Sequence, residues 1–246
     1  MMGELNSPPR VVVRDFTDAL ALRSTEELPL LETHVWRRRI DCPRTQIESL
    51  RELLTPDEEA RARRFHYDKD RNEFIVSRGT LRTLIGSYLS IAPKELSFRY
   101  SEYGQPKLEG DRSIEFNVSH SGGMLLLAFS LNRRIGVDVE TIRRDFSTLE
   151  IAERFFSECE RRSLRELPEE LRHPAFFRCW TRKEAFIKAL GEGLSHPLDQ
   201  FDVSLAAGAH PILLATRPDS NEASRWAMCD VAVPDGFAAA LAIKLR

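Results

Sequence analysis

The chain has 246 residues, of which 42% are hydrophobic and 30% are charged, and its formal net charge is −2. This composition is ordinary for one large folded domain or two small ones and excludes a disordered chain. The near balance of acids and bases indicates no nucleic-acid partner.

The first 32 residues show no sustained apolar period and contain prolines, so we expect a loosely ordered N-terminal extension over residues 1–32. They also lack the apolar segment of a secretion signal. The N-terminal half then covers residues 33–133. Its clearest element is the helix that begins in TPDEEARARRF, with Thr55 as N-cap and Pro56 at the first helical position. The other elements expected in this half are the strand HVWRRRI, a helix over 70–89, a strand over 96–100, the turn EYGQPKL and the strands EFNVSH and MLLLAFSL.

The C-terminal half covers residues 134–246 and opens with the strand IGVDVE. A helical stretch over 149–167 follows, and after a proline break a helix over 176–190 ends at Gly191 and Gly193. Strands are expected near 201–205, 211–215, 226–233 and 237–243.

The two halves repeat one order of helices and strands, and VSHSGGMLLLAFS aligns with VAVPDGFAAALAI so that Gly123 matches Gly236. We interpret this as a weak internal duplication. It predicts an α+β fold of two pseudo-symmetric halves, each a small antiparallel sheet packed with helices, with the active site between them.

The four cysteines lie far apart without a CxxC pair, which favours buried free thiols over disulfides or zinc. No apolar stretch reaches the roughly 18 residues of a membrane span. These features predict a soluble, cytoplasmic protein.

Asp138 and Glu140 stand two residues apart in an apolar, β-branched run, so both carboxylates share one face of a strand. They are either a pair of metal ligands or the solvent face of an edge strand. In WTRKEAFIKALGEGL, Glu184 and Lys188 are neighbours on one helix face, where they form either a phosphate and metal site or an exposed ion pair. Lys183 falls on the apolar face and needs a partner. Carboxylates, phosphate oxygens and water are the ligands that Mg²⁺ prefers.

His120, in NVSHSGG, precedes a glycine turn whose amides and the hydroxyls of Ser119 or Ser121 suit a phosphate, although a hydrogen-bonded turn histidine is the alternative. The early helices carry a basic cluster that is either a solvated face or a site for a phosphorylated ligand, and its members are Arg61, Arg63, Arg64, Arg71, Arg78 and Arg82.

In this order and at these separations, YGQPKL, FNVSHSGG, IGVDVE, RFFSECE and WTRKEAFIKALGEGL resemble the 4'-phosphopantetheinyl transferase family, in its long, monomeric surfactin-synthetase-activating type. The resemblance spans about residues 35–203. It implies transfer of 4'-phosphopantetheine from coenzyme A to a serine of an apo acyl or peptidyl carrier protein, which leaves 3',5'-adenosine bisphosphate. It also implies a monomer that resembles a fused pair of shorter subunits.

The resemblance assigns roles residue by residue. It makes Asp138, Glu140 and Glu184 the Mg²⁺ ligands and Lys188 the cation at the pyrophosphate. It implies that either Glu160 or a metal-held water next to it deprotonates the serine. It implies that the coenzyme A contacts are Arg61, Gly104, Gln105, Pro106, Ser119, His120, Lys183 and Lys188.

One position departs from the family. This chain has Gly104, Gln105 and Pro106 where the family commonly has Gly-Lys-Pro, so Gln105 replaces a lysine. The loss of that cation predicts weaker coenzyme A binding unless Lys107 supplies the charge. A non-catalytic coenzyme A or nucleotide-binding module is the alternative function, and a metal-dependent phosphohydrolase is the third.

Overall fold

The computed structural model describes residues 8–16, 27–110, 113–191 and 196–245. Its α-helices are α1 (Arg44–Arg51), α2 (Pro56–Arg63), α3 (Asp68–Leu89), α4 (Thr148–Phe155), α5 (Glu158–Glu166) and α6 (Glu169–Leu190). Its strands are β1 (Arg10–Asp15), β2 (Glu32–Arg39), β3 (Phe98–Tyr100), β4 (Pro106–Leu108), β5 (Ile114–Ser121), β6 (Met124–Leu131), β7 (Ile135–Thr141), β8 (Phe201–Val203), β9 (Leu213–Thr216), β10 (Trp226–Asp230) and β11 (Phe237–Lys244).

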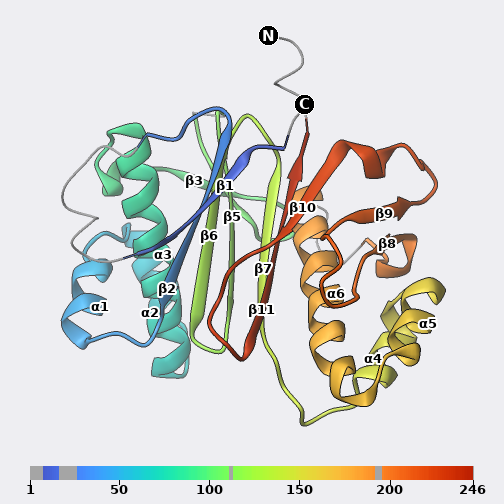
Figure 1. Cartoon of the computed structure of the whole chain (residues 1–246). Coiled ribbons are helices and arrows are strands. Elements are labelled where there is room, and N and C mark those ends of the chain that lie inside the picture. The colour runs from blue at the N-terminus through green and yellow to red at the C-terminus, as the bar shows by residue number, and fades with distance from the viewer. Residues whose placement is uncertain (1–7, 17–26, 111–112, 192–195, 246) are drawn as a thin grey trace.

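Two sheets lie face to face between two groups of helices (Figure 1). The first sheet has the strand order β1-β2-β6-β5 and the second β10-β11-β7, and two further pairs are β3-β4 and β8-β9. Only β1 and β2 run parallel among these described pairs; the others are antiparallel. The predicted α+β class is therefore confirmed, although the first sheet is mixed.

Strand β6 explains why the layers hold together. Leu125, Leu127 and Phe129 belong to the core against α1–α3, whereas Leu126 and Ala128 belong to the core between the sheets. Because both faces of β6 are buried, its sequence is a continuous apolar run rather than an alternation.

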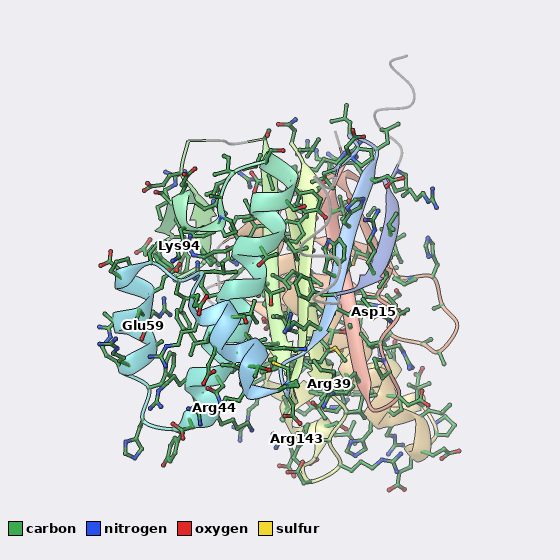
Figure 2. The ribbon with its side chains drawn as sticks, turned by 90° about the vertical axis from the view of Figure 1, so that its left-hand side faces the viewer. Asp15, Arg39, Arg44, Glu59, Lys94 and Arg143 are labelled. Atoms are coloured by element: carbon green, nitrogen blue, oxygen red, sulfur yellow. The ribbon has the colours of Figure 1, made fainter. Side chains whose placement is uncertain are left out.

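The start of α2 confirms the sequence prediction. Thr55 is the N-cap, Pro56 occupies the first turn, and Glu58 completes a capping box with Thr55. The same carboxylate accepts from Arg82 Nε at 2.7 Å, so this cap also joins α2 to α3. Figure 2 looks onto this helical side of the molecule, with Arg44 labelled on α1 and Glu59 on α2.

The prediction of a loose N-terminal extension is wrong where the chain is described. Residues Arg10–Asp15 form β1 and pair with β2 in parallel, and Phe16 is 8% exposed against Trp36. Parallel pairing joins segments far apart in sequence, so a local pattern does not reveal it. Residues 1–7 and 17–26 of this extension lie outside the described part.

Three other expectations need correction. The stretch over 149–167 is two helices, because Ser157 caps α5 through a capping box. Helix α6 begins at Glu169, two turns earlier than predicted, and accommodates Pro174. Helix α1 was not predicted. Gly191 ends α6 in the left-handed conformation as expected, while Gly193 lies outside the described residues.

Smaller predictions are resolved as follows. All four cysteines are free, and Cys179 is buried, but Cys159 is exposed. Gly123 and Gly236 directly precede β6 and β11, and both have positive φ, at 78° and 88°. Within the described residues, no helix has both the length and the apolar character to cross a membrane.

Candidate active site

Helix α6 lies directly on strand β7 at a glycine. A Cβ at Gly136 would lie 2.1 Å from the Ala185 carbonyl oxygen and 2.4 Å from Ala189 N. The absence of a side chain at Gly136 therefore lets the helix approach the strand closely. This contact brings Glu184 and Lys188 of α6 to the face of β7 that carries the two acids.

Asp138 is the centre of the site. It is 3% exposed, and its Oδ1 lies 2.7 Å from Lys188 Nζ and accepts from Ser119 Oγ at 2.9 Å. Its Oδ2 is buried and accepts no hydrogen bond. One oxygen is thus held by the protein, and the other is available to a ligand.

Two further carboxylates converge on Asp138. Burial, together with the charges of Asp138 and Glu140, raises the pKa of Glu184 to about 7 against the opposing effect of Lys188. Burial likewise raises the pKa of Glu140, with Asp138 adding to the rise and the Ser121 hydroxyl opposing it. Acids that repel one another in a buried site mark a place suited to a cation.

The donor set fits Mg²⁺ in its chemistry. Glu184 Oε1, like Asp138 Oδ2, is buried and without a hydrogen-bond partner. Buried acceptors are seldom unpaired, and hard oxygen donors of this kind suit a divalent cation. In the described part of the chain, however, no three His, Cys, Asp or Glu side chains are placed to hold one ion together.

Glu160 and Lys183 form a separate, buried pair. Lys183 is fully buried, lies 2.8 Å from Glu160 Oε2, and donates to the carbonyls of Leu198 and Phe201 at 2.7 and 2.6 Å. The other Glu160 oxygen accepts from Val203 N at 2.8 Å. Neither residue is among the charges that shift the pKa of Glu184.

The structure therefore does not support the expected roles of these two residues. Both oxygens of Glu160 are bonded within the protein, and the carboxylate is 2% exposed, so it has no access to an incoming serine. Lys183 is equally enclosed and has no access to coenzyme A. Their contacts join α5, α6 and β8.

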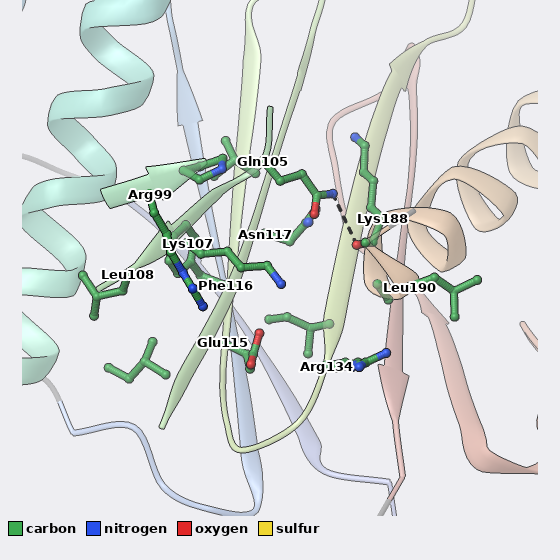
Figure 3. A pocket seen from close by; sticks show the side chains of 16 residues that line it. Arg99, Gln105, Lys107, Leu108, Glu115, Phe116, Asn117, Arg134, Lys188 and Leu190 are labelled. Atoms are coloured by element: carbon green, nitrogen blue, oxygen red, sulfur yellow. Dashed lines mark hydrogen bonds between the residues drawn. The ribbon is translucent and has the colours of Figure 1, made fainter. Parts of the chain in front are cut away.

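A cationic cavity of about 360 Å³, whose lining is drawn in Figure 3, has Lys188 in its wall. Lys188 both lines this cavity and contacts Asp138, so it links the cavity to the carboxylates. Among the described residues of its wall, Glu115 is the one carboxylate, and the cations are Arg99, Lys107, Arg134 and Lys188. This charge balance suits an anionic ligand such as a phosphate ester.

Gln105 and Pro106 line this cavity. The Gln105 amide donates to the Lys188 carbonyl at 3.3 Å, so it contacts the end of α6 (Figure 3). Lys107 lies in the same wall, in a position to supply the cation that Gln105 lacks. Gly104 has a φ of 76°, a backbone conformation that glycine adopts without steric cost. It shapes the turn before Gln105 but does not line the cavity.

Ser119 is placed differently from its expected role. It is 5% exposed, and its hydroxyl donates to Asp138 while it accepts from Lys188 Nζ at 2.8 Å and Val139 N at 3.3 Å. One donor and two acceptor positions are all that a hydroxyl has. Ser119 therefore has no capacity left for an adenosine phosphate.

His120 and Arg61 lie apart from the carboxylates. His120 is exposed and pairs with Glu73 of α3, so it already has a partner within the protein. Arg61 stacks over Phe74 and Tyr100, at 5.1 and 5.4 Å from the ring centres, and lines a second hollow of about 430 Å³.

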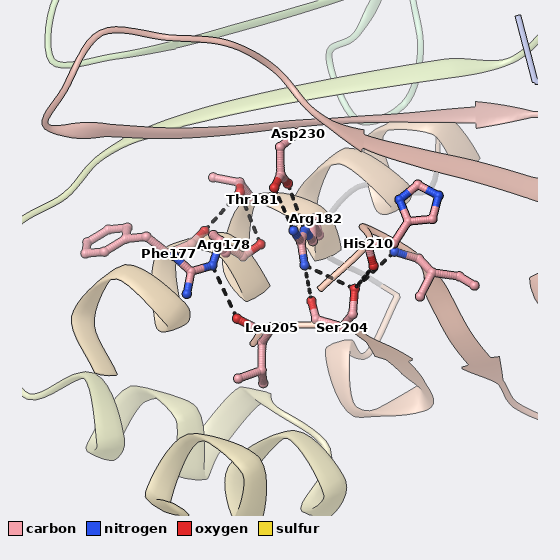
Figure 4. A network of polar contacts seen from close by, with 9 residues as sticks. Phe177, Arg178, Thr181, Arg182, Ser204, Leu205, His210 and Asp230 are labelled. Atoms are coloured by element: carbon pink, nitrogen blue, oxygen red, sulfur yellow. Dashed lines mark hydrogen bonds and ion pairs between the residues drawn. The ribbon is translucent and has the colours of Figure 1, made fainter. Parts of the chain in front are cut away.

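A polar network holds α6 from its other side (Figure 4). Arg182, 1% exposed, donates to both Asp230 oxygens at 2.9 and 2.7 Å and to the Ser204 carbonyl at 2.5 Å. The Ser204 hydroxyl donates in turn to the His210 carbonyl at 2.9 Å. Through Arg182, β10 and the β8–β9 segment fix the helix that carries Glu184 and Lys188.

The sequence suggested Ser121 only as a possible phosphate contact and gave Asn117 no role. Ser121 donates to Glu140 Oε2 at 2.8 Å, and Asn117 accepts from Val137 N at 3.1 Å. The available signal was the alternation of FNVSHS, which puts Asn117, Ser119 and Ser121 on one face of β5. The sequence did not reveal that this face meets β7.

Two family models match the chain. One, described as the 4'-phosphopantetheinyl transferase superfamily, matches residues 134–242. The other, described as 4'-phosphopantetheinyl transferase, N-terminal, matches residues 41–132.

Known proteins are also similar to the chain. The 4'-phosphopantetheinyl transferase HetI of Nostoc sp. is 38% identical over 216 residues, which cover 86% of this chain and 87% of HetI. The 4'-phosphopantetheinyl transferase Sfp of Bacillus subtilis is 33% identical over 168 residues, covering 68% and 74%. The crystal structure of Thermotoga maritima holo-[acyl-carrier-protein] synthase has a TM-score of 0.37 and 28% identity, and the match covers 45% of this chain and 61% of that one.

Proposed function

The chain belongs to the 4'-phosphopantetheinyl transferase superfamily, and from this premise we propose how its residues transfer phosphopantetheine from coenzyme A to a serine of an apo carrier protein. The serine oxygen forms a bond to the β-phosphorus of coenzyme A. The bond from that phosphorus to the bridging oxygen breaks, and 3',5'-adenosine bisphosphate leaves. The serine proton is released in the process.

Asp138, Glu140 and Glu184 would hold Mg²⁺ together with the pyrophosphate of coenzyme A. The ion would supply positive charge to the phosphoryl oxygens, where negative charge develops. The unpaired oxygens of Asp138 and Glu184 support this assignment. Phosphate oxygens and water would complete the coordination, as they commonly do for this ion.

Lys188 would neutralise the pyrophosphate and the leaving oxygen. Its ammonium already contacts Asp138, and its side chain also forms part of the cationic cavity wall. A fixed cation next to the breaking bond stabilises the transition state more than the ground state.

The cavity lined by Arg99, Lys107 and Arg134 would take the anionic part of coenzyme A, with Gln105 and Pro106 at its wall. Gly104 would shape the turn that precedes them. Arg61 of α2 and His120 of β5 would contact the adenosine phosphates. Glu160 and Lys183 would act as structural residues, because both are enclosed by protein contacts.

One observation carries the proposal: Asp138 and Glu184 each keep a buried oxygen without a hydrogen-bond partner, and Lys188, which contacts Asp138, also lines a cationic cavity. Strand β5 of the N-terminal half and β7 and α6 of the C-terminal half all come from one chain. We therefore propose a monomeric enzyme, which size-exclusion chromatography with light scattering would test.

The proposed function is tested by the intact mass of an apo carrier protein incubated with the protein, coenzyme A and Mg²⁺. We expect a gain of one phosphopantetheine that EDTA and Asp138→Ala both abolish. A gain that persists in EDTA would contradict the magnesium site. Coenzyme A binding without transfer to any of several acyl and peptidyl carriers would favour a binding module. Release of adenosine bisphosphate without a carrier would indicate a phosphohydrolase.

A further inference from the structure

The two sheets are joined by side chains rather than by a backbone ladder. Strand β7 lies at the edge of its sheet, and alternate N–H groups on its outer side face β5. Side-chain oxygens of β5 accept three of them, with distances of 3.1 Å from Val137 N to Asn117, 3.3 Å from Val139 N to Ser119 and 3.2 Å from Thr141 N to Ser121. These bonds satisfy edge groups that would otherwise lack a partner.

The two serines have a second contact that repeats with the same spacing. Ser119 donates to Asp138 at 2.9 Å, and Ser121 donates to Glu140 at 2.8 Å. Each hydroxyl thus accepts from one residue of β7 and donates to the carboxylate of the residue before it. At the third step the residue before Val137 is Gly136, which has no side chain, so Asn117 makes only the backbone bond.

This geometry points to Ser119 and Ser121 as positioning residues that orient the metal-binding carboxylates of β7, an inference that rests on the proposed function. An N–H of β7 fixes each hydroxyl oxygen, and the hydroxyl then fixes one carboxylate oxygen. For Asp138, the other oxygen is left buried and unpaired, ready for a ligand. Groups that orient metal ligands in this way commonly account for about 10–100-fold in metal affinity.

Ser121 gives the cleaner test, because Ser119 also contacts Lys188. Ser121→Ala removes the donor to Glu140 and the acceptor for Thr141 N. Ser121→Thr keeps the hydroxyl and is the rescue variant. Asn117→Ala is the control for the sheet contact, since it removes the same kind of backbone acceptor from the same face of β5. Asn117 also lines the proposed coenzyme A cavity, so this variant is compared only after its own coenzyme A saturation has been measured.

The measurement is a Mn²⁺ titration followed by the electron paramagnetic resonance of free Mn²⁺, with coenzyme A raised to saturation for each variant and no carrier protein. We expect Ser121→Ala to weaken Mn²⁺ binding by about tenfold or more. The Mn²⁺ affinity of Ser121→Thr and of Asn117→Ala should stay within about threefold of the wild-type value. In urea unfolding, Asn117→Ala and Ser121→Ala should lower the midpoint by comparable amounts.

The inference is overturned if wild type transfers phosphopantetheine in a Mg²⁺-dependent reaction and Ser121→Ala binds Mn²⁺ as tightly as wild type. It is also overturned if Asn117→Ala weakens Mn²⁺ as much as Ser121→Ala, because the effect would then come from the sheet contact alone. Failure of the proposed function would look different, since wild type itself would neither bind Mn²⁺ with coenzyme A nor modify a carrier.

Discussion

Lys183 and Glu184 are neighbours on α6 with opposite surroundings. The Lys183 ammonium is enclosed by Glu160 and two carbonyls, whereas the Glu184 carboxylate is half-buried beside Asp138 and retains an unpaired oxygen. Consecutive helical positions are about 100° apart, so a single helix presents one residue to the protein interior and the next to the site. The motif RKEAFIK thus combines a structural cation with a functional acid.

The raised pKa of Glu184 makes the metal-free protein less stable as the pH increases. Folded Glu184 has a pKa of about 7 against an ordinary 4.5, so the folded state binds this proton more tightly than the unfolded state. The contribution of Glu184 to stability is highest below about pH 4.5, falls as the pH rises to about 7, and is level above that. The span is at most about 3 kcal/mol, reduced to about 1–2 kcal/mol by the partial exposure of the group.

Urea unfolding in EDTA at pH 5 and pH 8 measures this effect. In Glu184→Gln, we expect most of the fall in the free energy of unfolding between the two pH values to disappear. Part of the fall should remain, because the pKa of Glu140 is also raised. The same variant should abolish transfer. Equal slopes in wild type and Glu184→Gln would contradict the assignment.

The Lys183–Glu160 pair predicts a large loss of stability when one partner is removed. Lys183→Met leaves a carboxylate that is 2% exposed without its cation, which should cost about 3–5 kcal/mol. Adding Glu160→Gln should restore most of that loss, because the buried charge disappears. Chemical denaturation of both variants measures the difference.

The transfer activity of the Lys183→Met, Glu160→Gln double variant shows whether Glu160 is a structural residue or a general base. If the pair is structural, the folded double variant retains kcat within about tenfold of wild type. A loss of 100-fold or more, at a temperature where the variant is folded, would restore Glu160 as the general base.

At the scale of elements, the contact between β7 and α6 controls the site. It depends on Gly136, where any side chain would meet the backbone of α6. Four of the proposed site residues lie on these two elements: Asp138 and Glu140 on β7, and Glu184 and Lys188 on α6. A change in their separation would therefore move the acids relative to the lysine.

Gly136→Ala should destabilise the protein by about 3 kcal/mol and lower transfer together with stability, because α6 must move away from β7. Gly208→Ala is the control: it has a positive φ of 74° and no atoms within 4 Å of the added Cβ. That variant should lose only about 1 kcal/mol and keep its activity. The prediction fails if both variants have the same urea midpoint.

The elements differ in how far the sequence predicts them. The start of α2 and the acid face of β7 were correct, because a cap and a two-residue alternation are local features. The break between α4 and α5 was missed, although Ser157 and Glu160 form a capping box that the sequence contains. Strand β1 was missed because its partner, β2, lies some 20 residues away and the pairing is parallel.

At the scale of the whole molecule, the N-terminal segment belongs to the fold. Val11 and Val13 of β1 pack onto the core between the sheets, and Phe16 packs edge-on against Trp36 at 6.4 Å. The Arg38 guanidinium also covers the Phe16 ring at 4.7 Å. This segment therefore extends the first sheet and closes one end of a core.

Phe16→Ala should lower the free energy of unfolding by about 2–4 kcal/mol, because a large buried ring is lost from a packed core. Leu30→Ala, at a position that is 39% exposed, should change it by less than about 0.5 kcal/mol. Denaturation curves of the two variants provide the comparison. Indistinguishable curves would mean that the segment adds little to the fold.

The sequence by itself determined the class of the fold and the family, and it predicted the acids and the lysine of the proposed site. These depend on local chemistry: the period of a strand, the spacing of a helix face and an ordered set of short motifs. The tertiary structure alone decided which groups those residues meet. It enclosed Glu160 with Lys183, used all the hydrogen-bonding capacity of Ser119 and placed Ser121 on Glu140. The physical reason is that a pattern specifies which face a side chain occupies, whereas its partner depends on how distant elements pack against that face.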